Sequence, residues 1–483
     1  MRPFAFIGFS ALLLASSALV LGMNGCGGES TSPSAAGSGT ASVLNAASKI
    51  QHVVIIVQEN RTPDNLFHDQ VLMDRGADIV STGLNSSGDT VPLQPLSLGQ
   101  TYDLSHKHSA FLKMYDSGKM DGADKVPVVC PVSKPHCGPP LNPQFAYVKP
   151  SDVQPYFDIA EQYTFGDRMF QTNEGPSYPA HQFILSGTSA PTSTSSWFDA
   201  ENPGAQWASN TGCTAPSFVR VPMINRFGYE KALMYPCFEH STLPDLLDAK
   251  KLSWRYYAPS AGSIWTAPNT ISHLCGPTAE LGGGQKCASA EWTDNVVLYT
   301  IQNPAPILVD IAKGGLPAVS WVIPASQNSD HSSDLANVDG PSWVAAIVNA
   351  IGGSSYWRNT AILITWDDWG GWYDHVPPPQ VINDATSWGS GYVYGFRVPL
   401  IVVSPYAKAQ YISHVTHDFG SILHFIETIY NLPSLGYADA RADDLSDCFD
   451  FSQQPLGFQM IAAPKSADHF LHDQRPAGDP DDD

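Results

Sequence analysis

The sequence predicts an α/β fold with a mainly parallel central sheet flanked by helices, and two observations carry that prediction. Four short apolar, β-branched runs stand at 53–57, 318–323, 361–365 and 398–403. They are nearly continuous rather than alternating, which is typical of strands buried on both faces of a parallel sheet. Helical patterns lie between or after them, as at 343–351 and 419–430. Strands that alternate with helices favour helices packed on a sheet.

The two ends of the chain have compositions that differ from the middle. Residues 1–25 have the form of a secretory signal, with an early Arg before an apolar stretch rich in Ala and Ser. Cys26 follows directly, so we expect either a lipoprotein signal with a lipidated Cys26 or ordinary cleavage nearby. We predict a flexible linker at 26–48, a single domain at 49–465 and a disordered acidic tail at 466–483.

The charge balance excludes one class of function. The chain has 25 Lys+Arg and 46 Asp+Glu, a formal net charge of −21. Nucleic-acid binding needs clustered cations, so this balance argues against a nucleic-acid partner. It does not exclude an anionic substrate, because a bound metal ion can reverse the sign of the charge locally.

Seven cysteines follow Cys26, and their spacing predicts local disulfides rather than a zinc site, since no CxxC pair is present. The stretch at 100–300 holds most of them among Pro-, Gly- and Ser-rich loops, so we expect it to form insertions that cap the sheet. The predicted pairs, with Cys448 left over, are Cys130–Cys137, Cys213–Cys237 and Cys275–Cys287.

Polar residues follow three of the predicted strands. Glu59 and Asn60 come after the first run, Asp367 and Asp368 after the third, and His331 lies beyond the second. Ligands of α/β sheets lie beyond the carboxyl ends of the strands. Singly, such carboxylates are more often helix caps or turn residues. Together they are hard oxygen donors that suit one divalent metal ion, with Mg²⁺, Ca²⁺ and Mn²⁺ left open.

A serine and several histidines complete the candidate set. Ser177 lies in a Gly-Pro-Ser-Tyr-Pro turn before a predicted helix, where it is either a plain N-cap or a nucleophile beside the metal. His106, His331 and His375 could donate to phosphoryl oxygens or protonate a leaving alkoxide. The other histidines, His181 among them although it is close to Ser177, are expected to be structural.

These segments also occur together in a known family. The motifs are HVVIIVQENRTPDNLF at 52–67, DLSH…GKMDG at 103–122, GPSYP at 175–179, STLPDLLDAKKLSWRYY at 241–257, WDDWGGWYDHVPPP at 366–379, GFRVPLIVVSPYAK at 395–408 and HDFGSILHFIE at 417–427. In this order the chain resembles the bacterial phosphoesterase family that contains phospholipases C and respiratory-burst-inhibiting acid phosphatases. The resemblance spans about residues 50–432.

The resemblance implies an alkaline-phosphatase-like fold and metal-assisted cleavage of phosphate esters through a phosphoserine. It places Glu59, Asn60, Asp367 and Asp368 at the metal, Ser177 as nucleophile and His106, His331 and His375 as catalytic histidines, with Asn60, His106 and His331 also contacting substrate. Three departures stand out: Thr62-Pro63 replaces Ser-Phe, Ala180-His181 replaces Asn-Arg, and Asp368 replaces Glu.

The sequence therefore favours an exported phosphomonoesterase, located in the periplasm, on the cell surface as a lipoprotein, or outside the cell. One alternative is a phospholipase C that cleaves phospholipid headgroups, and a second is a non-catalytic surface binding protein. The expected partner is a small phosphate ester or a phospholipid, and a lipidated Cys26 would add a membrane tether. A sulfatase is not favoured, because no Cys-x-Pro-x-Arg site is present.

Overall fold

The structure is a computed structural model that describes residues 49–130, 136–225, 227–280, 283–332, 335–380 and 394–478. All of these residues belong to one compact unit of the chain, Ser42–Asp483. The predicted signal peptide, the lipidated Cys26 and the linker at 26–48 all fall outside the described residues.

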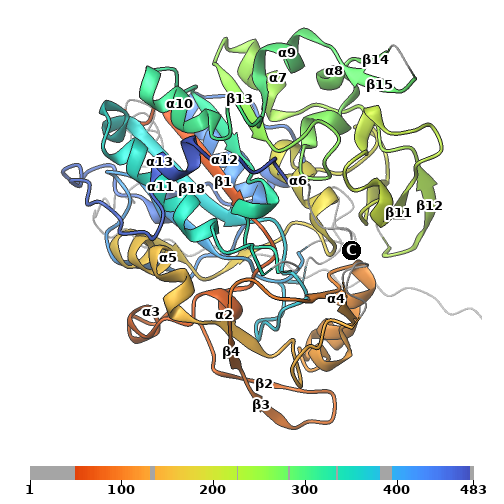
Figure 1. The fold of residues 1–483 in the computed structure, drawn as a ribbon, viewed down its shortest axis with the longest axis vertical. Helices are drawn as coiled ribbons and strands as arrows, with labels where there is room; N and C mark the ends of the chain where they lie inside the picture. The colour runs from red at the N-terminus through yellow and green to blue at the C-terminus, as the bar shows by residue number, and fades with distance from the viewer. Residues whose placement is uncertain are drawn as a thin grey trace, which may run out of the picture. The chain divides into compact units, whose positions relative to one another are not determined.

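A twisted eight-stranded sheet forms the centre of this unit (Figure 1). Its pairs are parallel except where β19 runs antiparallel to its two neighbours. The predicted α/β class and mainly parallel sheet are confirmed, and the four apolar runs correspond to β1, β17, β18 and β19. In spatial order the strands are β16 (Val296–Leu298), β13 (Trp254–Ala258), β17 (Val319–Val322), β1 (His52–Gln58), β18 (Thr360–Trp366), β19 (Leu400–Val403), β8 (Thr164–Gly166) and β20 (Tyr411–Ser413).

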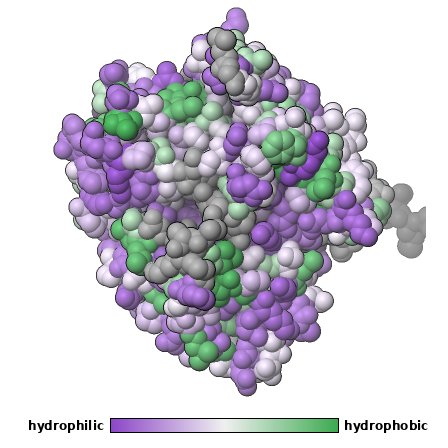
Figure 2. All heavy atoms as spheres, turned by 45° about the vertical axis from the view of Figure 1, so that its right-hand side comes forward, coloured by the Kyte–Doolittle hydropathy of each residue, from purple (hydrophilic) through white to green (hydrophobic). Residues whose placement is uncertain are grey.

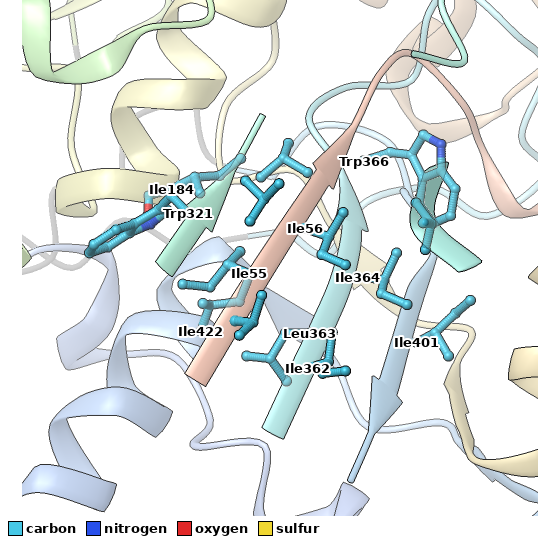
Figure 3. Close-up of a cluster of buried hydrophobic side chains, with 14 of the residues drawn as sticks. Ile55, Ile56, Ile184, Trp321, Ile362, Leu363, Ile364, Trp366, Ile401 and Ile422 are labelled. Atoms are coloured by element: carbon cyan, nitrogen blue, oxygen red, sulfur yellow. The ribbon is translucent and has the colours of Figure 1, made fainter. Parts of the chain in front are cut away.

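The central strands are buried on both faces. All seven residues of β18 are buried, as is every residue of β1 after His52. Figure 3 shows the aliphatic side chains of β1, β18 and β19 side by side, with Ile422 from α12 among them and Trp321 beside Ile184 from α6. Because both faces of these strands are apolar, both must be covered by other elements, which the helices do.

Two groups of helices flank the sheet (Figure 1). Helices α5, α10 and α13 pack on α11, whereas α6 packs on α7 and α12. The predicted helical patterns at 343–351 and 419–430 lie in α11 and α12. The helices are α2 (Pro63–Leu66), α3 (Gln70–Asp74), α4 (His108–Tyr115), α5 (Pro150–Gln162), α6 (Ser177–Ser186), α7 (Leu243–Ala249), α8 (Ser272–Cys275), α9 (Ala290–Asn295), α10 (Pro306–Lys313), α11 (Gly340–Gly352), α12 (Phe419–Tyr430) and α13 (Ala467–Leu471).

The stretch at 100–300 is only partly an insertion. It supplies three strands of the central sheet, β8, β13 and β16, which its many Pro and Gly residues obscure in the sequence. The three predicted disulfides are confirmed, and Cys448 is free and buried. Smaller sheets surround the main one: β2 (Thr82–Leu84) with β3 (Thr90–Pro92), β4 (Gln94–Leu96) with β7 (Ala146–Val148), β5 (Asp103–Leu104) with β6 (Val128–Val129), β9 (Met169–Phe170) with β21 (His417–Asp418), β14 (Pro277–Ala279) with β15 (Gln285–Cys287), and β10 (Trp197–Asp199), β11 (Val221–Asn225) and β12 (Glu230–Met234) together.

The predicted tail needs a correction. Helix α13 lies inside 466–483, and its Phe470 is buried with its ring 5.2 Å from that of Trp343. One large apolar side chain anchors this segment, which the acidic composition around it did not reveal. Across the described part of the chain, no helix has both the length and the apolar composition to cross a membrane.

Candidate active site

Two neighbouring strands bring the predicted carboxylates together at one edge of the sheet. β1 and β18 pair in parallel and end in register, with Gln58 opposite Trp366. The backbone N–H of Asp367 continues the ladder by donating to the Gln58 carbonyl at 2.9 Å, and the Asn60 N–H donates to Asp367 Oδ1 at 3.1 Å. Glu59, Asn60 and Asp367 are therefore fixed side by side, and all three are fully buried.

The turn after β1 is held in a costly conformation. Asn60 has φ +62°, in the left-handed region that non-glycine residues seldom adopt. Gly370, just beyond the aspartate pair, lies against it: a Cβ on Gly370 would stand 2.3 Å from the Asn60 carbonyl oxygen. The left-handed turn and the close approach of Gly370 together hold the Asn60 backbone against the segment that follows β18.

Ser177 lies at the first position of α6, directly after Pro176. Its Oγ donates to Asp368 Oδ2 at 3.0 Å, and Asp368 Oδ1 accepts the Gly370 N–H at 2.7 Å. The Ser177 side chain is buried, at 1% exposure. The N-terminal amides of a helix favour anionic groups beside them, so a phosphoryl group near this hydroxyl would be stabilised.

The structure adds one residue that the sequence did not assign to the site. His181 lies four residues after Ser177 on the same face of α6. Its Nε2 lies 3.4 Å from Glu59 Oε1 and 3.7 Å from Asp367 Oδ2, and ligand atoms of the three residues all lie within 4.8 Å of one another. The i, i+4 spacing to Ser177 was the signal that could have found it.

Several buried polar atoms at this edge have no hydrogen-bond partner among the described residues: Glu59 Oε1 and Oε2, Asn60 Oδ1, Asp367 Oδ2, and both ring nitrogens of His181. Buried polar atoms are normally paired, because leaving one unpaired costs about 1–3 kcal/mol. Carboxylate, amide and imidazole atoms grouped in this way are the donor set of a divalent metal ion. The residues present therefore fit such an ion.

Electrostatics agree with that fit. Burial, followed by the charge of Asp367, raises the pKa of Glu59 well above its usual range and that of Asp368 to about 8. Burial lowers the pKa of His181 to about 4, which leaves its imidazole neutral and able to bind a cation. A bound cation would offset the repulsion among the carboxylates.

His106 lies beside Asn60, and His331 lies next to His106. His106 Nε2 is 3.4 Å from Asn60 Nδ2, and its Nδ1 is 3.0 Å from the Leu104 carbonyl oxygen. The rings of His106 and His331 are 6.2 Å apart, and Asp103 Oδ2 lies 3.9 Å from a nitrogen of each. Both imidazoles are therefore close to the carboxylate edge, as the sequence predicts.

The residue before His331 has a structural role. Asp330 Oδ2 accepts hydrogen bonds from the Tyr156 hydroxyl at 2.8 Å and from Trp366 Nε1 at 2.9 Å, and burial raises its pKa to about 6. Gln58 Oε1 accepts the Asp330 backbone N–H at 3.1 Å. These contacts tie the loop that carries His331 to the ends of β1 and β18.

The described contacts of His375 are with other residues. Its Nδ1 lies 2.7 Å from Asp64 Oδ2 and its Nε2 3.0 Å from Asp78 Oδ1. Arg397 completes this group by donating to Asp374 through Nε at 2.9 Å and Nη2 at 3.0 Å. The structure thus brings together all the predicted site residues except His375, which belongs to this second cluster.

A third cluster lies next to the loop that precedes Ser177. His108 Nε2 is 3.3 Å from Glu174 Oε2, and its Nδ1 is 3.2 Å from Glu230 Oε2. Its backbone N–H donates to Glu201 Oε1 at 3.0 Å. Glu174 stands three residues before Ser177, so this acidic group borders the site without entering it.

Comparisons with known proteins assign the chain to one family. A model of the Phosphoesterase family matches residues 50–433, which is most of the chain. The chain belongs to this family. It is a hydrolase that acts on phosphate esters, as the motifs and the carboxylate edge imply.

Its relatives include named enzymes. Phospholipase C B of Mycobacterium tuberculosis (strain ATCC 25618 / H37Rv) is 23% identical over 447 residues, which cover 84% of this chain and 78% of that protein. Non-hemolytic phospholipase C of Pseudomonas aeruginosa is 23% identical over 456 residues, covering 83% and 57%. Among solved structures, a protein in the alkaline phosphatase superfamily from Vibrio parahaemolyticus aligns with a TM-score of 0.36 at 11% identity, covering 83% and 72%.

Proposed function

We propose that this phosphoesterase is an exported, metal-assisted phospholipase C that acts through a phosphoserine at Ser177. The observation that carries the proposal is the Ser177 hydroxyl, hydrogen-bonded to Asp368 beside Glu59 and Asp367, whose oxygens lack partners among the described residues. The sequence alone favours a phosphomonoesterase. The names of the relatives support the alternative instead, and we adopt it.

The metal would be held by Glu59, Asn60, Asp367 and Asp368, with His181 as a further ligand. Its identity is left open, since oxygen donors and one imidazole suit several divalent ions. When bound, it supplies positive charge that lowers the pKa of a nearby hydroxyl and stabilises phosphoryl oxygens.

The residues of the chain then divide the reaction between them. Asp368 takes the Ser177 proton while Oγ attacks phosphorus in line and the bond to the leaving alkoxide breaks. His106 or His331 gives that alkoxide a proton. In the second step the same histidine takes a proton from water, the water oxygen attacks phosphorus, and Ser177 leaves with the proton returned by Asp368. Asn60 donates to a phosphoryl oxygen, whereas His375 takes no part in these steps.

The disulfides support export of the protein to an oxidising compartment. Three disulfides are typical of proteins that fold in an oxidising environment. We therefore place the enzyme in the periplasm, on the cell surface or outside the cell. A tether through Cys26 remains part of the proposal.

The test compares a soluble diester with a monoester. Purified protein with added divalent metal is assayed on p-nitrophenyl phosphorylcholine and on p-nitrophenyl phosphate, and we expect the higher kcat/KM on the diester. The reverse preference would favour the phosphomonoesterase. Metal binding without hydrolysis of either ester would favour a non-catalytic binding protein.

The nucleophile has its own test. Ser177→Ala should lower kcat by at least ~10³-fold, because no other group forms the covalent intermediate. Enzyme that is acid-quenched during turnover of p-nitrophenyl phosphorylcholine should carry phosphorylcholine on Ser177 by peptide mass spectrometry. The exposed Ser193, changed to Ala, is the matched control and should keep full activity. A near-wild-type rate in Ser177→Ala would overturn the assignment.

A further inference from the structure

One hairpin of the molecule exposes large hydrophobic side chains. β11 and β12 form it, with β12 at the edge of a three-stranded sheet. We call its exposed hydrophobic residues, together with Phe218 just before β11, the hairpin patch. Figure 2 shows groups of hydrophobic residues among the hydrophilic ones on the face of the molecule that it presents. The members of the patch and their exposures are Phe227 74%, Phe218 65%, Leu233 65%, Tyr229 50% and Met234 37%.

The alternation along β12 shows that this exposure is part of the fold. Ala232 packs against the main hydrophobic core, whereas Lys231 and Leu233 on either side of it are exposed. Neighbouring residues of a strand point to opposite faces, so the outward face presents Lys231 and Leu233. In a strand that faces only water, that outward face would be polar.

The turn of the hairpin holds its aromatic residues in place. Asn225 Oδ1 accepts the backbone N–H of Phe227 at 2.9 Å and that of Tyr229 at 3.1 Å. Gly228 between them has φ +74°, a conformation that glycine adopts readily. The large aromatic side chains of Phe227 and Tyr229 thus belong to residues whose backbones are held by hydrogen bonds.

The hairpin is connected to the loop that precedes Ser177 by short contacts. Glu230, the first residue of β12, contacts His108, which contacts Glu174 three residues before Ser177. On the other strand, the Pro222 carbonyl accepts the Ala200 N–H at 3.0 Å. The patch therefore lies on an element that borders the loop that precedes Ser177.

Cations accompany the aromatic residues. Lys231 Nζ lies 4.8 Å from the centre of the Tyr229 ring, and the Arg220 guanidinium lies 5.9 Å from that of Tyr235. Such pairs are typical of segments that lie at a membrane interface, with apolar rings among the headgroups and cations beside the phosphates. In a chain of net charge −21, this local positive charge is complementary to phospholipid headgroups.

We propose that the hairpin patch docks the enzyme on a phospholipid bilayer and holds the site at the surface where its substrate lies. This proposal rests on the proposed function. A second copy of the chain is a poorer occupant. β12 is a short edge strand, it carries Lys231, and a register irregularity between Met223 and Ile224 disrupts its pairing. These features protect sheet edges from pairing with each other.

The experiment separates binding from catalysis. Sedimentation with phosphatidylcholine vesicles, with and without added phosphatidylglycerol, measures partitioning of the full chain and of the double variant Phe227→Ser/Leu233→Ser. We expect partitioning to fall at least ~10-fold in the variant, because two exposed apolar side chains leave the interface. Hydrolysis of soluble p-nitrophenyl phosphorylcholine should not change. Met460→Ser, at a residue 71% exposed outside the patch, is the control and should bind as the wild type.

Three other outcomes separate the docking surface from the proposed function. If the wild type hydrolyses the soluble ester but sediments with neither vesicle, the proposal is wrong and the proposed function stands. A wild-type dimer by light scattering that becomes a monomer in the double variant assigns the patch to a second copy. If the protein binds vesicles but hydrolyses no ester, the docking surface is supported and the proposed function is wrong.

Discussion

Two clusters in this molecule each contain two buried carboxylates and one histidine, and they differ in one component. Glu59, Asp367 and His181 form one, and Asp64, Asp374 and His375 form the other, each with ligand atoms within 4.8 Å of one another. In the second, the buried Arg397 donates to Asp374 and lies 3.5 Å from Asp64. In the first, no Lys or Arg of the described residues pairs with a carboxylate.

The difference shows how to separate a structural cluster from a metal site. Buried carboxylates need a cation to remain charged. At the Arg397 cluster the chain supplies it, and the hydrogen bonds are complete. At the Glu59 cluster the ligand atoms lack partners among the described residues, and under the proposed function a bound metal ion supplies the cation. If only the proximity of histidines and acids were considered, both clusters would be taken for metal sites.

The largest expected effect comes from removing a ligand at the Glu59 cluster. Glu59→Gln should lower kcat/KM on p-nitrophenyl phosphorylcholine by on the order of 10³-fold, because the metal supplies much of the charge stabilisation in phosphoryl transfer. Metal that raises the Tm of the wild type should no longer raise that of the variant. Thermal melts with and without added metal measure this.

The matched control is Glu239→Gln, at a half-exposed glutamate that pairs with His273 outside the site. It should keep both activity and the metal-dependent rise in Tm. The metal-free Glu59→Gln protein should be at least as stable as the metal-free wild type, since a buried like charge has been removed. A large loss of stability there would make the Glu59 cluster a structural one.

Asp374→Asn should act in the opposite way. It leaves the Arg397 guanidinium buried with its main partner neutralised, and breaking a buried ion pair costs about 3–5 kcal/mol. Urea unfolding in metal-free buffer should show this loss, with the metal content of the folded protein unchanged. If the variant is instead more stable and binds less metal, the comparison between the clusters fails.

How much of the site follows from the sequence is clear from these residues. Glu59 and Asp367 follow apolar runs that read as buried strands, and parallel strands bring their carboxyl ends to one edge, so both were predictable. For His181 the sequence offers only its i, i+4 spacing to Ser177, and His375 lies inside the motif at 366–379. Neither signal reveals which acid the ring contacts, because tertiary packing decides that.

The fold shows the same limit. The runs that became β1 and β18 are continuous and apolar, and the pattern sufficed. β8 and β16 have three residues each and lie in the Pro- and Gly-rich stretch, where local pattern is weak and the neighbouring strands decide. Phe470 anchors α13 through its contact with Trp343, which lies 127 residues earlier in the chain, and no local pattern predicts such a contact.

A matched pair of histidine substitutions sharpens the comparison. His181→Gln should weaken metal binding by at least about 10- to 100-fold, the range seen when even a residue that only orients a metal ligand is lost. His375→Gln should leave metal affinity unchanged and lower stability modestly, because a hydrogen-bond partner of Asp64 is weakened. Isothermal titration with the metal distinguishes them. Equal metal affinity in the two variants would remove His181 from the ligand set.

The smallest expected effect concerns the cluster of acids around His108. Here the chain supplies a cation only while His108 is protonated. Although burial opposes it, hydrogen bonds with Glu174 and Glu230 raise the pKa of His108 to about 9. Burial raises the pKa of Glu174 to about 7 and that of Glu201 to about 8. All three folded-state values lie above the unfolded ones, so the folded protein binds more protons and its stability falls as pH rises.

The stabilisation from His108 is complete below its unfolded pKa of about 6.5 and is lost as pH rises through about 9. Over the same range the buried glutamates ionise at a growing cost. Glu201→Gln keeps an acceptor for the His108 N–H but cannot ionise, so the decline in unfolding free energy from pH 6 to 9 should be shallower by about 1 kcal/mol. Urea unfolding at each pH measures both slopes. Parallel slopes would show that Glu201 does not titrate with the cluster, and the acids around His108 would then resemble the complete network at Arg397.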